Sequence, residues 1–254
     1  MTDLTGQTIL LTGASGGIGA VTAAILGAAG ASVIAHYAGD ETAAQRATRE
    51  IPAERKLLLG ADFRQPGAAR DLWARALAWR GRIDVLVNNA AIMPENPIDG
   101  SDEEWDTAWA QILQVNVVEP ASLIRDAVRH YRTAGGGVII TLSSWSGQQG
   151  SAIPQLSAYA AAKAAIKAVA QTVARVHAAD GVLSYVISPG LVRTPLTEIS
   201  VRFRGGEDAV RKILPLGDMV PPAEVGELIA FLATGTVRHL TGATLDINGA
   251  AYVR

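Results

Sequence analysis

A tyrosine and a lysine four residues apart could perform proton transfer. Tyr159 and Lys163 occur in the segment YAAAK, within an alanine-rich stretch that is expected to be helical. Residues four apart lie on one face of a helix, so the phenol and the ammonium group would be neighbours. A free phenol has a pKa of about 10, and a nearby positive charge lowers this pKa because it stabilises the phenolate. The pair is therefore a candidate proton donor and acceptor.

A glycine-rich turn is the second feature with a chemical interpretation. The sequence TGASGGIG, residues 12–19, follows a short apolar run and places Gly13, Gly17 and Gly19 in the spacing G-x-x-x-G-x-G. Backbone N–H groups in such a turn can face a pyrophosphate at a helix N-terminus, where the helix dipole favours negative charge. We expect a side chain at any of these glycines to hold the phosphates away. From this motif alone, a turn without a ligand is the alternative.

The elements that would position these residues alternate along the chain. Short apolar runs are continuous in hydrophobicity, as in strands buried on both faces of a parallel sheet. Longer helix-like segments separate them, so the order predicts a single-domain, Rossmann-like, doubly wound α/β fold over residues 1–254. The predicted strands are residues 8–11, 32–35, 56–60, 83–87, 137–142, 182–187 and 243–247, and the predicted helices are residues 18–29, 41–50, 67–80, 102–132, 157–179 and 222–232.

Composition excludes several functional classes. The formal net charge of -2 provides no basic footprint for nucleic acid, and no apolar run approaches the roughly 18 residues of a membrane span. The chain has no cysteine, which removes thiol catalysis and disulfides. The histidines are dispersed without metal-ligand spacing, so no metal site is predicted. The first residues do not have the pattern of a signal peptide, and a cytoplasmic location is expected.

One long segment is irregular. Residues 190–219 are rich in Arg, Gly and Pro and lie between the sixth predicted strand and the last predicted helix. A long irregular segment inside a compact domain usually forms a lid or a binding loop. We therefore predict that residues 190–219, called the lid below, cover a substrate site.

Six motifs in order resemble the classical branch of the short-chain dehydrogenase/reductase family, over essentially the whole chain. TGASGGIG resembles the cofactor turn of the family, and NNAA at residues 88–91 resembles its NNAG motif, with Ala91 in place of the glycine. SPGLVRT at residues 188–194 resembles its PG-x-x-x-T segment. Asn116 in VNV, Ser144 in TLSSWSG, and Tyr159 with Lys163 resemble its catalytic tetrad.

The resemblance implies a role for each member of the tetrad. Tyr159 would protonate the alkoxide that forms from a carbonyl, or deprotonate an alcohol in the reverse direction. Lys163 would lower the pKa of Tyr159 and hold the nicotinamide ribose hydroxyls. Ser144, selected over Ser143 by the S-x-x-G spacing, would polarise the substrate oxygen. Asn116 would hold a helix irregularity and a water that links Lys163 to solvent.

The resemblance also implies a nicotinamide cofactor. An acidic side chain at the end of the second strand would pair with the ribose 2′-OH of NAD, but the residues there are His36 and Tyr37, as in members that use NADP. NADP(H) is therefore favoured, and NAD(H) is the alternative because Gly16 replaces a basic residue of many NADP users. Asp62 would hold the adenine amino group. The expected cofactor contacts are Gly13, Ser15, Gly17, Ile18, Gly19, His36, Tyr37, Asp62, Phe63, Asn89, Ala90, Ala91, Tyr159, Lys163, Pro189, Gly190, Val192 and Thr194.

For the substrate, the resemblance implies a small carbonyl or alcohol compound and a homotetrameric enzyme. The expected substrate contacts are Met93, Ser144, Trp145, Gln149 and Ile153. One alternative is reduction of 3-oxoacyl groups on a carrier protein, which requires a basic docking patch; the candidate arginines are Arg125, Arg129, Arg132, Arg193, Arg202 and Arg204. Another alternative is a dinucleotide-sensing regulator without catalysis, which would have no reason to keep the tetrad.

Overall fold

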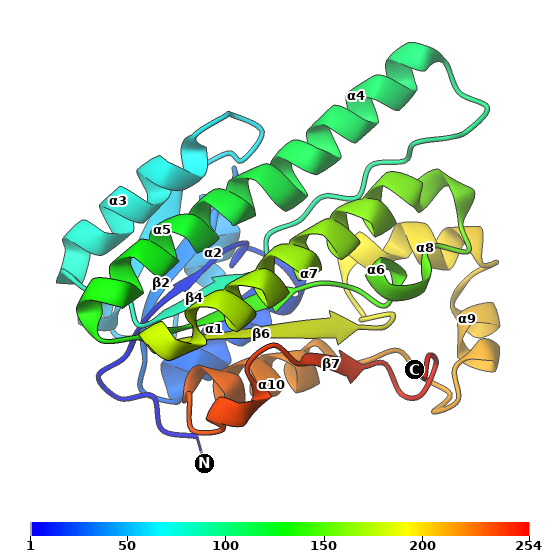
Figure 1. Ribbon diagram of the computed structural model, residues 1–254. Helices are drawn as coiled ribbons and strands as arrows, with labels where there is room; N and C mark the ends of the chain where they lie inside the picture. Colours follow the sequence, from blue (N-terminus) through cyan, green and yellow to red (C-terminus); the bar gives the residue numbers. More distant parts are fainter. Residues whose placement is uncertain (1, 254) are drawn as a thin grey trace.

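A parallel sheet with helices on both faces forms the centre of the protein. The computed structural model describes residues 2–253 and is drawn in Figure 1. Within these residues the sheet has seven strands in the order β3-β2-β1-β4-β5-β6-β7. The order runs outward in both directions from β1, as in a doubly wound fold. The strands are β1 Thr8–Leu11, β2 Ser32–Tyr37, β3 Lys56–Gly60, β4 Val85–Asn88, β5 Gly137–Leu142, β6 Val182–Pro189 and β7 Thr244–Ile247.

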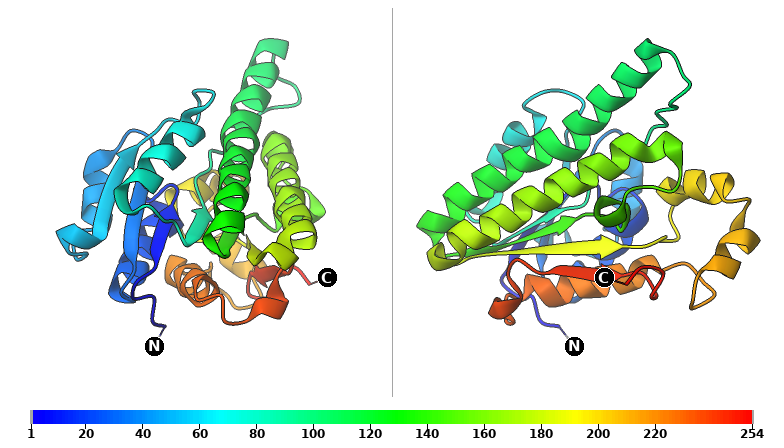
Figure 2. Two further views of the ribbon diagram at one scale, coloured as in Figure 1. Left: turned by 60° about the vertical axis from the view of Figure 1, so that its left-hand side comes forward. Right: turned by 45° about the vertical axis from the view of Figure 1, so that its right-hand side comes forward.

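Two helical layers cover the sheet, as the views in Figure 2 show. Helices α3, α5 and α7 pack on one face, and α1 and α10 pack together on the other. The helices are α1 Gly17–Ala28, α2 Glu41–Ala47, α3 Ala68–Arg80, α4 Asp102–Leu113, α5 Glu119–Ala134, α6 Ser146–Gln149, α7 Ser157–His177, α8 Glu198–Phe203, α9 Glu207–Ile213 and α10 Pro222–Ala233.

Alternate residues along the strands pack against the helices on opposite faces of the sheet. Ile9 and Leu11 of β1 belong to the core beneath α1 and α10, whereas Leu10 belongs to the core beneath α3, α5 and α7. All three side chains are fully buried. The continuous apolar runs of the sequence are therefore explained by burial on both faces, as predicted.

The helix predicted over residues 102–132 is interrupted. Residues Gln114–Val118 form a π-helical turn between α4 and α5. Pro120 follows at the start of α5 and has no N–H group to donate to the carbonyl of Asn116, four residues earlier. A one-turn π-helix accommodates such a missing bond. This turn contains Asn116 and is the helix irregularity that the resemblance implies there.

The lid is more regular than its composition predicts. It contains α8 and α9, of six and seven residues, and Val192 forms an isolated bridge with Val220. Helices this short carry too few periodic positions to be recognised in sequence. Together with α6 and the start of α4, the lid lies near the carboxyl ends of the strands (Figure 1).

Candidate active site

A cavity of about 810 Å³ opens at the carboxyl ends of the strands. Its walls include the turn after β1 and the residues that follow β4, the two strands between which the strand order reverses. Ligands of doubly wound sheets bind at this position. The predicted site residues that line the cavity are Gly13, Ser15, Gly17, Ile18, His36, Asp62, Phe63, Asn89, Ala90, Ala91, Met93, Ser144, Tyr159, Lys163, Pro189, Gly190, Val192 and Thr194.

The glycine-rich turn is shaped mainly by the packing of the chain against itself. A Cβ atom on Gly19 would overlap the carbonyl oxygen of Gly13 and lie 2.7 Å from Nδ2 of Asn89. A Cβ atom on Gly13 would lie 2.9 Å from Cα of Ala90. The sequence predicts that these glycines make room for phosphates, but at Gly13 and Gly19 contacts within the chain already exclude a side chain. Gly17 has a positive φ of 52°, which favours glycine for a conformational reason.

The same turn suits an anionic ligand. Gly16 is the N-cap of α1, and within the described chain no side chain caps this helix. The N–H groups of a first turn lack partners inside the helix, and the helix dipole favours negative charge there. The cavity and its uncapped helix N-terminus therefore fit the pyrophosphate of a dinucleotide.

Side chains after β1 and β4 fasten the turn to the sheet. Oγ1 of Thr12 accepts hydrogen bonds from the backbone N–H groups of Asn89 and Ala90, at 2.9 and 3.0 Å. Nδ2 of Asn89 donates to the carbonyl of Thr12 at 2.8 Å. These reciprocal bonds hold two walls of the cavity at a fixed separation.

His36 joins the turn to β3 as a neutral imidazole. Its Nδ1 accepts from the N–H of Gly13 at 3.1 Å, and its Nε2 lies 2.8 Å from the carbonyl of Ala61, so the proton resides on Nε2. Burial lowers the pKa of His36 to about 4, with a smaller contribution from the charge of Arg75. The ring stacks on Phe63 with centroids 4.5 Å apart. His36 therefore lines the cavity and connects the glycine-rich turn to the residue after β3.

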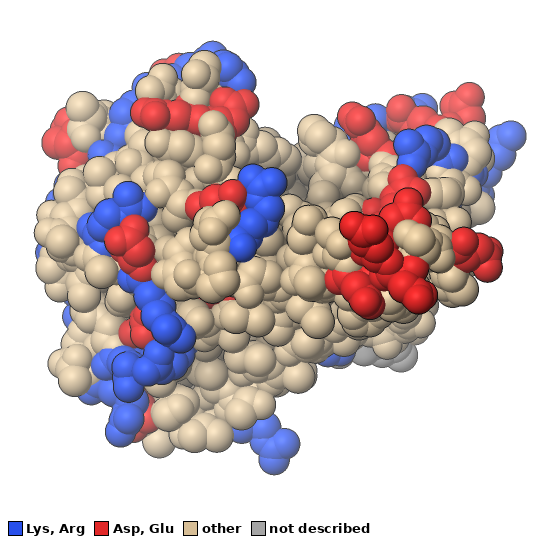
Figure 3. Space-filling view, turned by 90° about the horizontal axis from the view of Figure 1, so that it is seen from above, with Lys and Arg blue, Asp and Glu red and all other residues tan. Residues whose placement is uncertain are grey.

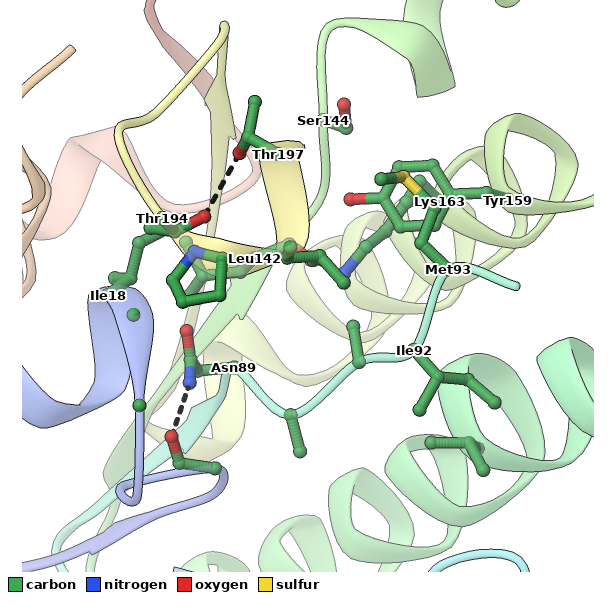
Figure 4. Close-up of a pocket in the computed structure, with 18 of the residues that line it drawn as sticks. Ile18, Asn89, Ile92, Met93, Leu142, Ser144, Tyr159, Lys163, Thr194 and Thr197 are labelled. Carbon is green, nitrogen blue, oxygen red and sulfur yellow. Dashed lines mark hydrogen bonds between the residues drawn. The ribbon is translucent and has the colours of Figure 1, made fainter. Parts of the chain in front are cut away.

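The catalytic candidates Ser144, Tyr159 and Lys163 meet at the other end of the cavity. Figure 4 shows Tyr159 and Lys163 extending from α7 into the cavity, with Ser144 nearby. Lys163 is buried, and its Nζ donates to the carbonyl of Leu142 at 2.8 Å. Nζ lies 5.7 Å from the centroid of the Tyr159 ring. The spacing of YAAAK thus places both groups on the same side of the helix, as predicted.

The pKa values of this pair differ from our expectation. Burial raises the pKa of Tyr159 to about 12, although the hydrogen bond with Ser144 acts in the opposite direction. Burial lowers the pKa of Lys163 to about 8. Desolvation disfavours the charged form of each group, which raises the pKa of the phenol and lowers that of the ammonium group. At neutral pH Tyr159 is therefore a neutral phenol, which is suited to donate a proton.

Asn116 acts on the backbone rather than on the cavity wall. Its Oδ1 accepts from the N–H of Ile92 at 2.9 Å, and its Nδ2 donates to the carbonyl of the same residue at 2.8 Å. The π-helical turn is therefore hydrogen-bonded, through the buried Asn116, to the segment after β4. Ile92 and the neighbouring Met93 line the cavity, so Asn116 sets the position of a wall.

Other predicted contacts lie away from the cavity wall. The ring of Tyr37 lies against Gly60, because a Cβ atom on Gly60 would be 3.1 Å from Cε2 of the ring. Trp145 packs against the buried lid residues Leu191, Val210, Leu214 and Met219 instead of facing the cavity. Gln149 is exposed in α6, and Ile153 is buried in the loop that follows. These three residues follow Ser144 in sequence, but they do not face the cavity because the short helix α6 changes the direction of the chain.

Some wall residues were not predicted from the sequence. The clearest is Arg64, whose Nε lies 3.0 Å from both carboxylate oxygens of Asp62. Its nearness to Asp62 in sequence was the available signal. Further wall residues that sequence reasoning did not assign to the cofactor or the substrate include Ala38, Pro94, Gln111, Val115, Leu142, Pro195, Leu196 and Thr197.

Neither a metal site nor a membrane span is found in the described part of the chain. Residues 2–253 contain no group of three or more His, Asp or Glu side chains placed to hold a metal ion. Over the same residues, no helix has the length and apolar character needed to cross a bilayer.

Comparison with known proteins identifies relatives over nearly the full length. A family model described as enoyl-(acyl carrier protein) reductase matches residues 13–250. Cis-4-hydroxycyclohexanecarboxylate dehydrogenase of Sinomonas cyclohexanicum is 34% identical over 242 residues, covering 94% of this chain and 94% of that protein. The 3-oxoacyl-(acyl-carrier-protein) reductase FabG of Escherichia coli strain K12 is 32% identical over 250 residues, covering 98% of both chains.

A solved structure extends this similarity to the fold. The 3-ketoacyl-(acyl-carrier-protein) reductase from Brucella melitensis, complexed with NADH, superposes with a TM-score of 0.86 at 27% identity. The superposition covers 99% of this chain and 100% of that one. The chain therefore belongs to the short-chain dehydrogenase/reductase family of NAD(P)-dependent oxidoreductases.

Proposed function

We propose that this chain is an NADPH-linked reductase of a small carbonyl compound, with Tyr159 as the proton donor. One observation supports this proposal above the others: Ser144, Tyr159 and Lys163 share one cavity with the uncapped glycine-rich turn. A site with both features can bind a dinucleotide and perform acid–base chemistry beside it. The nicotinamide, when bound, supplies the hydride.

The roles of the chain's own groups follow from their protonation states. The Ser144 hydroxyl donates to the substrate oxygen and orients it toward the phenol of Tyr159. Tyr159 transfers its proton to that oxygen, and the ammonium group of Lys163 stabilises the phenolate that remains. Because burial holds the pKa of Tyr159 near 12, the phenol is fully protonated at neutral pH. A protonated phenol is the form of Tyr159 that carbonyl reduction requires.

The preference for NADP is supported by the charges of the adenosine end. Ala38 lines the cavity after β2, where a small side chain leaves room for a 2′-phosphate. Of the described residues that line the cavity, Arg64 and Lys163 are the Lys or Arg side chains. Lys163 is at the catalytic end, so Arg64 is the cation that would meet a 2′-phosphate, while Asp62 remains the proposed adenine ligand.

Adenosine fragments test this preference without turnover. In Arg64→Gln we expect about tenfold weaker binding of 2′,5′-ADP, in line with the loss of a charge-assisted hydrogen bond, and unchanged binding of 5′-AMP. Arg70→Gln, at an exposed position outside the cavity wall, is the matched control. Equal affinity of both fragments for the wild type would instead favour NAD.

A small molecule fits the surface around the cavity better than an acidic carrier protein. No Lys, Arg or His occurs between residues 83 and 124, and the acidic side chains before and within α4 include Glu95, Asp99, Asp102, Glu103 and Glu104. Acidic side chains gather on the right of Figure 3, where α4 begins. Such a surface repels an acidic partner.

The predicted basic patches do not compensate for this acidity. Arg193 is paired with Glu207 and Asp218, and Arg202 is paired with Glu95. Arg125 and Arg129 are exposed on α5, which runs toward the amino end of β5 and thus away from the cavity. Arg132 binds Asp180, and Arg204 is half-buried over the ring of Trp145.

Replacement of one hydroxyl tests the mechanism. Tyr159→Phe should abolish cofactor oxidation with a panel of aldehydes, ketones, sugars and acyl thioesters, while NADPH still binds in a fluorescence titration. The control is Tyr185→Phe, which removes a buried hydroxyl bonded to the carbonyl of Val237, away from the cavity. Full activity of Tyr159→Phe would refute the mechanism, and NADPH binding without turnover in the wild type would support a regulator.

Two further features belong to the same proposal. We propose a homotetramer, supported by the exposed apolar side chains of Leu113, just before the π-helical turn, and Val118, at its end; a monomer in sedimentation at micromolar concentration would refute it. We also propose a cytoplasmic location, which imaging of a tagged chain would test.

A further inference from the structure

Asn96 is a fully buried polar residue in the loop between β4 and α4. Its side chain contacts the start of α7, the helix that carries Tyr159 and Lys163. Nδ2 of Asn96 donates to Oγ of Ser157 at 2.7 Å, and Oδ1 accepts from the N–H of Ala158 at 3.2 Å. The backbone N–H of Asn96 also donates to the carbonyl of Gln155 at 2.8 Å. Three bonds thus tie one residue to the beginning of this helix.

These contacts replace a cap that α7 does not provide for itself. Leu156 is the N-cap residue, and its side chain has no group that could accept a hydrogen bond. The first N–H groups of a helix need partners from outside the helix. Asn96 satisfies one of them, at the residue immediately before Tyr159, although it lies 62 positions from Ala158 in sequence.

The loop that contains Asn96 also touches the substrate side of the site. Met93 and Pro94 line the cavity, and Glu95 forms an ion pair with Arg202 of α8 in the lid. The cavity wall, the lid contact and the helix cap therefore occupy consecutive residues of one short segment. A shift of this segment would move the phenol of Tyr159 relative to the wall formed by Met93.

We propose that Asn96 is a positioning residue for the reaction: it fixes the first turn of α7, and with it Tyr159, against the cavity wall. This inference rests on the proposed role of Tyr159 as proton donor. Proton transfer requires hydrogen-bond distance between donor and acceptor, and misplacement by about 1 Å can cost about 100-fold in rate. Asn96 therefore controls turnover without touching the substrate or the cofactor.

Three variants test the inference. Asn96→Ala removes both side-chain bonds, and we expect kcat to fall about 10- to 100-fold with NADPH affinity within twofold of wild type. Asn96→Asp keeps the acceptor for Ala158 and can accept from Ser157, so we expect it to recover most of kcat. Thr48→Ala is the control: Thr48 is also fully buried, and its hydroxyl binds the carbonyl of Ala44 at the end of α2, outside the cavity wall.

Amide hydrogen exchange gives a readout that does not depend on activity. In Asn96→Ala, exchange should increase in peptides covering residues 155–163, and in Thr48→Ala these peptides should exchange as in wild type. Faster exchange in Asn96→Ala with an unchanged kcat would reduce Asn96 to a structural cap and overturn the proposal. Unchanged exchange would overturn it as well, even in the absence of an identified substrate. If the wild type shows no turnover with any substrate, that result counts against the proposed function and not against the role of Asn96 in holding α7.

Discussion

Protonation of His36 should destabilise the fold and the cofactor turn together. Nδ1 of the neutral ring accepts a hydrogen bond from Gly13, and a protonated Nδ1 could no longer accept it. The unfolded chain binds this proton near pH 6.5, whereas burial delays protonation in the folded chain to about pH 4. The unfolded state therefore holds more protons between these values, so stability falls as the pH drops through this window.

The size of the effect follows from the two pKa values. A shift of one unit corresponds to about 1.4 kcal/mol, so the full displacement from 6.5 to about 4 is worth about 3 kcal/mol. Most of it develops on acidification from pH 7 to pH 5, over which we expect a loss of about 2 kcal/mol in the free energy of unfolding from this residue.

Urea unfolding of wild type and His36→Asn, followed by tryptophan fluorescence at pH 7 and pH 5, measures this loss. Asparagine does not titrate, and its Oδ1 can accept from Gly13. All other ionisable groups are the same in both proteins, so the difference between the two pH dependences reports on His36. We expect the wild type to lose about 2 kcal/mol more than the variant. Equal losses would show that His36 is already protonated or solvated in the folded protein.

Two further predictions concern the glycine-rich turn and Lys163, the proposed catalytic lysine. Gly19→Ala should weaken NADPH binding at least tenfold or prevent folding, whereas Gly16→Ala should behave as wild type, because no described atom lies within 4 Å of a Cβ atom there; equal binding by both variants would contradict the packing argument. Lys163→Met should lose turnover and gain about 1–3 kcal/mol in stability at pH 7, because the native chain buries a charge. Wild-type stability should rise from about pH 8 to 10.5, since the unfolded chain binds more protons there, and the variant should not show this rise in urea unfolding.

Short-range patterns in the sequence predicted most of the architecture. The apolar runs identified the strands because residues buried on both faces of a sheet must be apolar, and the order of strands and helices predicted a doubly wound sheet. Each of the seven predicted strands is present, with ends that differ by a few residues. The prediction of one uninterrupted helix over residues 102–132 is wrong, because a π-helical turn divides it. The missing hydrogen bond at Pro120 leaves little trace in the hydrophobic periodicity.

Motifs likewise located much of the site, since each is a local segment with its own conformation. The glycine-rich turn, the NNAA segment and YAAAK all contribute to one cavity. The contacts of Trp145 and Tyr37 were not predictable in this way. Their side chains turn toward the lid and toward Gly60, respectively, and the sequence does not specify the direction of a side chain beyond a turn.

The sequence alone thus determined the order of elements and identified the candidate reactive groups. Tertiary structure decided the protonation states of these groups and the long-range contacts that hold them in place. Burial set the pKa values of His36, Tyr159 and Lys163, because desolvation depends on every segment packed around a group. Folding also brought Asn96, in the loop between β4 and α4, to Ala158 in the first turn of α7, a hydrogen bond that no local pattern encodes. Periodicity and spacing report on neighbours along the chain, whereas solvation and long-range contacts exist only once the chain has folded.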